Sequence, residues 1–262
     1  MKNNTRINLI PMAGEGQRYK DLGYNMPKPF IDVDGVPMVV RACQSLPHAD
    51  KNIFVCRKNH LNQFPIQDIL EKYIDNVILV AIDELTEGQA ITCLAAREHI
   101  PDDAILNIGA SDNDMVYNED GIEKMYQNSQ IDGWIWTFRN NPAVLQNPKM
   151  YGWVETDKTK NKAIHISCKV PISENPMRDH AIIGAFTFKK AKFFFDAVNA
   201  MVSSNARINN EFYVDIALNF AIKTGLNIQI CEVDQYICWG TPKDYEEYQY
   251  WLSYFKKRLS FD

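Results

Sequence analysis

A glycine loop and a lysine flanked by prolines are the parts of this sequence best suited to phosphate chemistry. The loop, at residues 11–18, follows a short apolar run, and Gly14 and Gly16 let its backbone N–H groups approach an anion closely. Arg18 at the end of the loop can add charge-assisted hydrogen bonds. Lys28 stands between two prolines, which stiffen the backbone and fix the place of its ammonium group. The sequence therefore predicts a site for a phosphate chain.

Neither feature is specific when it stands alone, because a tight turn explains the loop and a solvated lysine in a proline turn explains Lys28. Two well-known nucleotide motifs are also absent from the sequence. Tyr19 takes the place of the third glycine of G-x-G-x-x-G, and no G-x-x-x-x-G-K-[ST] occurs. A Rossmann dinucleotide fingerprint and a Walker P-loop are thus both excluded.

The elements around the loop alternate in type along the first half of the chain. Short apolar runs predict buried strands at Ile7–Ile10, Asn52–Cys56, Val77–Ile82 and Ala104–Ile108. Amphipathic stretches between them predict helices at Pro37–Leu46, Ile66–Tyr73, Gly88–His99 and Gly121–Asn128. Such a series predicts an α/β fold, with a Rossmann-like, mostly parallel sheet and helices on both faces.

The pattern changes beyond about residue 131. Strand-like runs now dominate, at Trp134–Phe138, Tyr151–Thr156, Ala163–Cys168 and Ala181–Phe188, before a helix at Lys190–Met201. A helix at Asn210–Phe220, a strand at Asn227–Val233 and a helix at Pro242–Lys257 complete the chain. We expect a single domain over residues 1–262, with a nucleotide-binding half at about 1–130 and an acceptor-binding half of added mixed strands at about 131–262.

The last of these helices carries a stripe of aromatic and apolar side chains at helical spacing. Its members are Tyr245, Tyr248, Trp251, Leu252 and Phe255. Core packing is the simpler explanation, and a subunit interface in a homo-oligomer is the alternative.

Composition excludes several classes of partner. The 262 residues include 28 Lys and Arg against 33 Asp and Glu, so the net charge of −5 provides no cationic field for nucleic acid. The longest early apolar run is far shorter than the ~20 residues of a membrane span. We therefore expect a cytoplasmic protein that binds neither nucleic acid nor membrane. The six cysteines lack C-x-x-C spacing and are expected to be reduced and mostly buried.

The glycine loop, the arginine and the downstream P-K-P lysine, in this order after a first strand, resemble the N-terminal signature of the sugar-nucleotide pyrophosphorylases. These enzymes are sugar-phosphate nucleotidylyltransferases with a GT-A-like nucleotidyltransferase fold, and they grip a nucleoside triphosphate with these elements. The resemblance also implies that the segment Glu87-Gly88-Gln89 contacts the nucleobase, although an acidic helix N-terminus is the simpler reading. The nucleotide contacts that it implies are Met12, Ala13, Gly14, Glu15, Gly16, Gln17, Arg18, Lys28, Glu87, Gly88, Gln89 and Ser111.

The same resemblance implies a Mg²⁺ cofactor held at the α-phosphate by Asp112, which follows the strand at Ala104–Ile108. Oxygen ligands at the carboxyl end of a parallel strand suit this ion. Asp114 is either a second metal ligand or a solvated loop carboxylate. One departure concerns the aspartate that the family commonly places just before a G-T motif, because Cys238 is found there and a thiol is a poor magnesium ligand.

On the acceptor side, the resemblance implies that a phosphorylated acceptor is held by the second half of the chain. The implied contacts are Tyr151, Gly152, Lys169, Gly184 and Glu211. Lys169 resembles the lysine of the family's E-K-P motif, which receives the acceptor phosphate. Cys168 replaces the glutamate of that motif, which leaves non-sugar acceptors such as polyol phosphates open.

The function that follows is transfer of a nucleotidyl group from a triphosphate, with a pyrimidine preferred, to a sugar phosphate or polyol phosphate. Pyrophosphate is released, and the product serves as an activated precursor for surface polysaccharide. Arg18, Lys28, Asp112 and Lys169 are the expected catalytic residues. Two alternatives stay open: a GT-A-like glycosyltransferase, because Asp112 and Asp114 form a D-x-D pattern, and a catalytically silent nucleotide-binding homologue.

Overall fold

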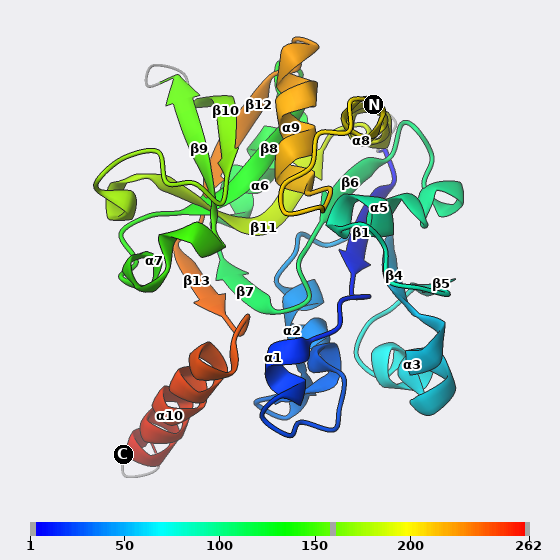
Figure 1. The fold of residues 1–262 in the computed structure, drawn as a ribbon, viewed down its shortest axis with the longest axis vertical. Coiled ribbons are helices and arrows are strands. Elements are labelled where there is room, and N and C mark those ends of the chain that lie inside the picture. Colours follow the sequence, from blue (N-terminus) through cyan, green and yellow to red (C-terminus); the bar gives the residue numbers. More distant parts are fainter. Residues whose placement is uncertain (1–3, 158–160, 260–262) are drawn as a thin grey trace.

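A nine-stranded sheet runs through both halves of the computed structural model, which describes residues 4–157 and 161–259. The strand order is β5-β4-β1-β6-β11-β8-β12-β10-β9 (Figure 1). These strands are β1 (Arg6–Pro11), β4 (Lys51–Arg57), β5 (Val77–Ile82), β6 (Ile105–Ile108), β8 (Gly133–Phe138), β9 (Gly152–Asp157), β10 (Lys162–Cys168), β11 (His180–Phe188) and β12 (Ile228–Glu232). Two small antiparallel pairs accompany the sheet, β7 (Asn113–Val116) with β13 (Gln235–Cys238) and β2 (Asp32–Val33) with β3 (Val36–Pro37).

The first half of the sheet is parallel, as the alternating pattern predicts. β4 and β6 flank β1, and β5 lies beyond β4, all in the same direction. The four predicted strands of this half are confirmed with nearly the same bounds. Their carboxyl ends therefore meet at one edge, where the glycine loop follows β1 and Asp112 follows β6.

The second half of the sheet is mixed. β11 runs antiparallel to β6 and β8, whereas β12 runs parallel to β8. β9 pairs with β10 and also with the start of β11, so the last strands curl into a small barrel-like closure. The added mixed strands predicted for this half thus belong to the same sheet, and the sheet as a whole is mixed rather than mostly parallel.

Helices cover both faces of the sheet because successive side chains of a strand point to opposite sides. On β1, Ile7 and Leu9 belong to one core cluster and Ile10 to the other. The first face is covered by α5 (Gln89–Leu94), α8 (Ala191–Ser203) and α9 (Val214–Lys223). The second is covered by α2 (Met38–Gln44), α4 (Ile66–Glu71) and α6 (Glu119–Gln127). The remaining α-helices of the described chain are α1 (Gln17–Lys20), α3 (Lys58–Gln63), α7 (Ala143–Gln146) and α10 (Pro242–Leu259).

Two predicted helices have different bounds in the structure. α5 ends at Leu94 and is followed by a separate 3₁₀ turn at Arg97–His99. α9 begins at Val214 rather than at Asn210, because Asn209 and Asn210 take positive φ values of 51° and 63° that do not continue a right-handed helix. Glu211 therefore lies in the loop before α9.

The aromatic stripe of α10 is divided between two environments. Tyr245 and Tyr248 pack against a small core of Tyr19, Met38 and Trp239. Trp251 and Phe255, one and two turns further on, are 48% and 55% exposed. Core packing therefore explains the first part of the stripe, and the second part leaves the alternative of a subunit interface open.

Two further expectations concern the whole chain. All six cysteines are free, and five of them are buried. In the residues that the structure describes, no helix is both long and apolar enough to span a bilayer.

Candidate active site

The glycine loop packs closely against Lys28. Met12 and Ala13 are buried after β1, and Gly16 adopts a left-handed φ of 64°. A Cβ at Gly16 would lie 3.0 Å from the Cβ of Lys28, so glycine suits both the backbone conformation and the close approach. The loop and the lysine, which are separate in the sequence, therefore form one wall of a site.

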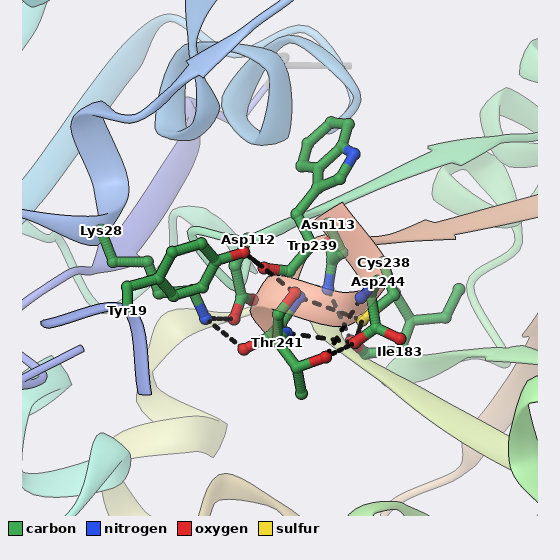
Figure 2. A network of polar contacts seen from close by, with 10 residues as sticks. Tyr19, Lys28, Asp112, Asn113, Ile183, Cys238, Trp239, Thr241 and Asp244 are labelled. Atoms are coloured by element: carbon green, nitrogen blue, oxygen red, sulfur yellow. Dashed lines mark hydrogen bonds and ion pairs between the residues drawn. The ribbon is translucent and has the colours of Figure 1, made fainter. Parts of the chain in front are cut away.

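Tyr19 connects this wall of the site to the segment that follows β13. Its ring is buried, and its hydroxyl lies 2.7 Å from the carbonyl oxygen of Trp239 and 3.0 Å from that of Thr241 (Figure 2). Burial raises the pKa of the phenol, and the negative charge of Asp112 acts in the same direction. The tyrosine that replaces the third glycine of a dinucleotide fingerprint is thus a neutral donor that fixes the segment after β13.

Replacement of Tyr19 by phenylalanine is expected to lower the free energy of unfolding by about 1–3 kcal/mol, because the one hydroxyl proton that the two carbonyl oxygens share is lost. Urea unfolding measures the effect. Tyr24→Phe is the matched control, because Tyr24 packs edge-on against Tyr19 and its hydroxyl has no hydrogen-bond partner among the described residues. Equal stability of the two variants would contradict this role of the Tyr19 hydroxyl.

Lys28 opens the short 3₁₀ turn Lys28–Phe30, whose Pro29 and Phe30 are buried. Its Nζ lies 2.5 Å from Oδ2 of Asp112 and 2.9 Å from the carbonyl oxygen of Gly240 (Figure 2). The ring of Tyr19 is 5.4 Å from the same atom. The prolines, the ion pair and the carbonyl together hold the ammonium group in one place, as the P-K-P pattern predicts.

Asp112 lies at the centre of this cluster, and its backbone oxygen accepts a hydrogen bond of 2.8 Å from the amide of Trp239. Cys238 follows on β13, and its sulfur accepts a hydrogen bond from the amide of Gly240 at 3.2 Å. Burial raises the pKa of this thiol to about 11, and Asp112 and Asp244 add to the effect. The thiol of the metal-free protein is therefore protonated at neutral pH. As a soft sulfur ligand it is also poorly suited to a hard cation.

The three side chains of the segment Asp112-Asn113-Asp114 have different neighbours. The Asn113 amide donates to the carbonyl of Ile183 at 2.7 Å and so ties β7 to β11. Burial raises the pKa of Asp114, and its charged neighbour is Arg41 of α2 rather than Lys28. Within residues 4–157 and 161–259, no three His, Cys, Asp or Glu side chains converge on a metal site. Both roles predicted for Asp114, metal ligand and loop carboxylate, stay predictions.

The segment predicted to contact a nucleobase is joined to the loop before α9. The Phe212 amide donates to the Glu87 carbonyl at 2.7 Å, and the Ala90 amide donates to the Phe212 carbonyl at 3.0 Å. Gly88 lies between these bonds with a φ of 119°, and a Cβ there would lie 2.7 Å from the Phe212 backbone. The Glu87 carboxylate pairs with Arg207 at 2.7 Å. Glu87 thus has a partner within the protein.

Gly152 and Asp215 define the predicted acceptor side. A Cβ at Gly152 would lie 2.2 Å from Oδ2 of Asp215, so only glycine leaves room for this carboxylate. Burial raises the pKa of Asp215 to about 6, while Lys169 and the Cys168 thiol stabilise its charged form and limit the rise. The pKa of Cys168 is raised to about 12 by burial and by Asp215. A carboxylate from α9 therefore lies beside Cys168, which stands where the E-K-P motif that this segment resembles has a glutamate.

Lys169 follows directly in a left-handed turn with a φ of 60°. Its amide donates to the carbonyl of Tyr151 at 3.0 Å, and its Nζ lies 4.8 Å from the centre of the Tyr213 ring. The lysine is thus held by its backbone and by a cation–π contact, which leaves the ammonium protons available to an anion.

The raised pKa of Asp215 predicts a specific dependence of stability on pH. Between its ordinary value of 3.8 and about 6, the folded state binds a proton that the unfolded state does not bind. Stability therefore rises as the pH falls through this range. Asp215→Asn is expected to lose this rise in urea unfolding at pH 4 to 8, whereas the exposed control Glu174→Gln is expected to keep it. Parallel curves for wild type and Asp215→Asn would contradict the assignment.

The structure places the predicted residues in three groups. Lys28 and Asp112 lie together with the glycine loop, Glu87 and Gly88 lie against Phe212, and Tyr151, Gly152 and Lys169 lie around Asp215. Gly184 bulges from β11 toward Ala110, and Glu211 hydrogen-bonds to Tyr213. Arg18 and Glu15 are exposed, Ser111 and Gln89 are half-buried, and Gln17 bonds to Asp21 within α1. The roles of these residues stay predictions.

Four contributors to this site could not be predicted from any motif of the sequence. Tyr19 was noted only as a missing glycine, and the Gly240 carbonyl could not be inferred from a side chain. Arg207 lies in a polar loop without any motif. Phe212, one residue after the predicted contact Glu211, falls inside the predicted helix Asn210–Phe220, which hides its place in a loop.

Comparisons with known proteins identify the family of this chain. The model of the family described as Nucleotidyl transferase matches residues 7–226. The UTP–glucose-1-phosphate uridylyltransferase AglF of Haloferax volcanii is 24% identical over 240 residues, which cover 91% of this chain and 93% of that protein.

Solved structures share the fold. A nucleoside-diphosphate-sugar pyrophosphorylase from Vibrio cholerae aligns with a TM-score of 0.75 and 20% identity over 92% of this chain and 98% of its own. The inositol-1-phosphate CTP transferase from T. maritima aligns with a TM-score of 0.70 and 14% identity over 95% and 97%. The family match spans most of the sequence and includes the glycine loop, Lys28, Asp112 and Lys169. This chain therefore belongs to the nucleotidyl transferase family and is a nucleotidyltransferase.

Proposed function

We propose that this enzyme couples a pyrimidine nucleoside triphosphate to a sugar phosphate or a polyol phosphate, releases pyrophosphate, and so makes an activated precursor for surface polysaccharide. The observation that carries the proposal is the fixed ammonium group of Lys28, held by Asp112 and Gly240 against the glycine loop. This places a cation beside backbone N–H groups at the carboxyl ends of β1 and β6, where phosphate chains bind in α/β sheets.

In the proposed reaction, a phosphate oxygen of the acceptor attacks the α-phosphorus of the triphosphate. The bond from the α-phosphorus to the bridging oxygen breaks, and pyrophosphate leaves with that electron pair. The attacking phosphate is already an anion at neutral pH, so the reaction needs no general base. Catalysis then consists of positioning two polyanions and neutralising their charge.

Three cations of this chain share that task. Lys28 is held where it can neutralise the triphosphate, and Arg18 at the start of α1 can reach the departing pyrophosphate. Lys169 holds the acceptor phosphate, because its cation–π contact with Tyr213 leaves its donors available. Two of the three are fixed before substrate binds, which lowers the cost of ordering them in the reaction.

The described residues fit a Mg²⁺ ion that is bound largely by its substrate. Asp112 would hold it, and Mg²⁺ commonly uses one or two carboxylates together with phosphate oxygens and water. Cys238 does not contribute, because a soft sulfur atom is a poor ligand for this hard cation. When bound, the ion supplies charge neutralisation at the α-phosphate.

The choice of substrates rests on the relatives and on the acceptor side. AglF acts with UTP on glucose 1-phosphate, and the T. maritima enzyme acts with CTP on inositol 1-phosphate, so pyrimidine nucleotides and both acceptor classes occur among similar proteins. Asp215 supplies a carboxylate beside Lys169 that can accept hydrogen bonds from acceptor hydroxyl groups. This supports a hydroxyl-bearing phosphate monoester as the acceptor.

The test is pyrophosphate release with Mg²⁺ for CTP, UTP, dTTP, GTP and ATP against sugar 1-phosphates and polyol phosphates. Release with one pyrimidine nucleotide and one acceptor class is the expected result. Release with purine nucleotides alone would contradict the base preference. Binding of a triphosphate by calorimetry without release from any pair would identify the silent homologue instead.

A further inference from the structure

The outer part of α10 is an exposed aromatic surface. Tyr250, Trp251, Tyr254 and Phe255 are 66%, 48%, 44% and 55% exposed, and their rings pack against one another with centroids 5.3 to 6.2 Å apart. We call these four residues the α10 aromatic patch. Figure 1 shows α10 extending away from the sheet, with its carboxyl end at the far tip. Such a patch on an exposed helix marks an interaction surface.

The charges at the two ends of the patch are opposite in sign. Glu247 and Arg258 are exposed. With Trp251 and Tyr254 between them, they form a series spaced four, three and four residues apart, which lies along one stripe of an α-helix. The spacing of the four residues is therefore the same from either end of the stripe, about a centre between Leu252 and Ser253. The charge, in contrast, is negative at one end and positive at the other.

From this pattern we infer that α10 pairs with α10 of a second copy of this chain, antiparallel and about a two-fold axis. Trp251 then lies opposite the partner's Tyr254, and Glu247 opposite the partner's Arg258. The same contacts occur twice, as an isologous interface requires. A parallel pairing would instead place Glu247 against Glu247 and Arg258 against Arg258, which is unfavourable.

The small size of the α10 stripe limits the affinity of the proposed dimer. The stripe from Glu247 to Arg258 is about 17 Å long at 1.5 Å per residue, so the helix pair alone forms a small interface. The aromatic rings provide most of the apolar area, and the two charge pairs set the orientation. We therefore expect a dimer that dissociates on dilution. This inference is independent of the substrates proposed above.

Sedimentation equilibrium over about a hundredfold range of protein concentration tests the pairing. The wild type is expected to shift from monomer to dimer within that range. Glu247→Arg and Arg258→Glu are each expected to stay monomeric, since each places like charges opposite one another. The double variant Glu247→Arg/Arg258→Glu restores opposite charges and is expected to dimerise again. Glu246→Arg, the same change on the neighbouring exposed residue outside the stripe, serves as the matched control.

Several results would overturn the inference. A wild type that stays monomeric throughout, a dimer that both single charge variants leave intact, or a double variant that does not recover would each do so. Co-flotation of monomeric wild type with vesicles of anionic lipid, lost in Trp251→Ala/Tyr254→Ala, would assign the patch to a membrane surface instead. Thermal unfolding confirms that each variant is folded, and pyrophosphate release reports separately on the active site.

Discussion

Lys28→Ala is expected to lower kcat by about a hundredfold to a thousandfold, the usual effect of removing one fixed group that stabilises charge in a transition state. The Nζ of Lys28 is held 2.5 Å from Asp112 and 2.9 Å from the Gly240 carbonyl, so no other lysine in the described chain has the same restraints. Steady-state pyrophosphate release measures kcat and KM for the triphosphate separately.

Two comparisons make this result interpretable. Lys20→Ala removes an exposed lysine from α1, close in sequence to the same loop, and is expected to leave kcat within about twofold, as surface changes usually do. Lys28→Arg keeps the charge but not the compact point geometry, and it is expected to recover only part of the rate. Near-normal turnover by well-folded Lys28→Ala would remove Lys28 from the mechanism.

Asp112→Asn is expected to lower kcat about a hundredfold and to raise the Mg²⁺ concentration needed for half-maximal activity. The change keeps the size of the side chain but removes the charge that fixes Lys28 and that would hold the metal ion. Activity measured as a function of Mg²⁺ concentration separates the two effects, because loss of metal affinity is overcome at high Mg²⁺ and misplacement of Lys28 is not.

Asp114→Asn decides the role of the second carboxylate of the D-N-D segment. Its neighbour is Arg41, so we expect little change in the Mg²⁺ requirement. An increase as large as that of Asp112→Asn would make Asp114 a metal ligand. An unchanged Mg²⁺ requirement in Asp112→Asn would refute the metal role of Asp112.

The parallel half of the fold was predictable because β1, β4 and β6 are buried on both faces and therefore appear as continuous apolar runs. β7 was not, because Asn113-Asp114-Met115-Val116 has no such run and its partner β13 lies far along the chain. The closure of β9 onto β11 likewise depends on a bulge near Gly184, a feature of backbone geometry. Pairing between distant segments carries little signal in local sequence.

The candidate site shows the same division. Lys28 and Asp112 each follow from their motifs, but the direct contact between them depends on the arrangement of two loops and a carbonyl of Gly240. Asp215 belongs to none of the motifs of the sequence. Its place beside Cys168 depends on the absence of a side chain at Gly152, and sequence spacing does not reveal that.

The two backbone hydrogen bonds of Phe212 have a consequence for how such an enzyme changes its substrates. Phe212 is fastened to the predicted base-contacting segment at Glu87 and Ala90, and it lies two and three residues before Val214 and Asp215, at the start of the helix that supplies the acceptor carboxylate. A chimaera that receives only the Arg207–Asp215 segment of a relative would also displace the loop around Gly88. If these segments have the proposed roles, we expect donor and acceptor preferences to change together, and a hybrid enzyme to need both segments from the same relative.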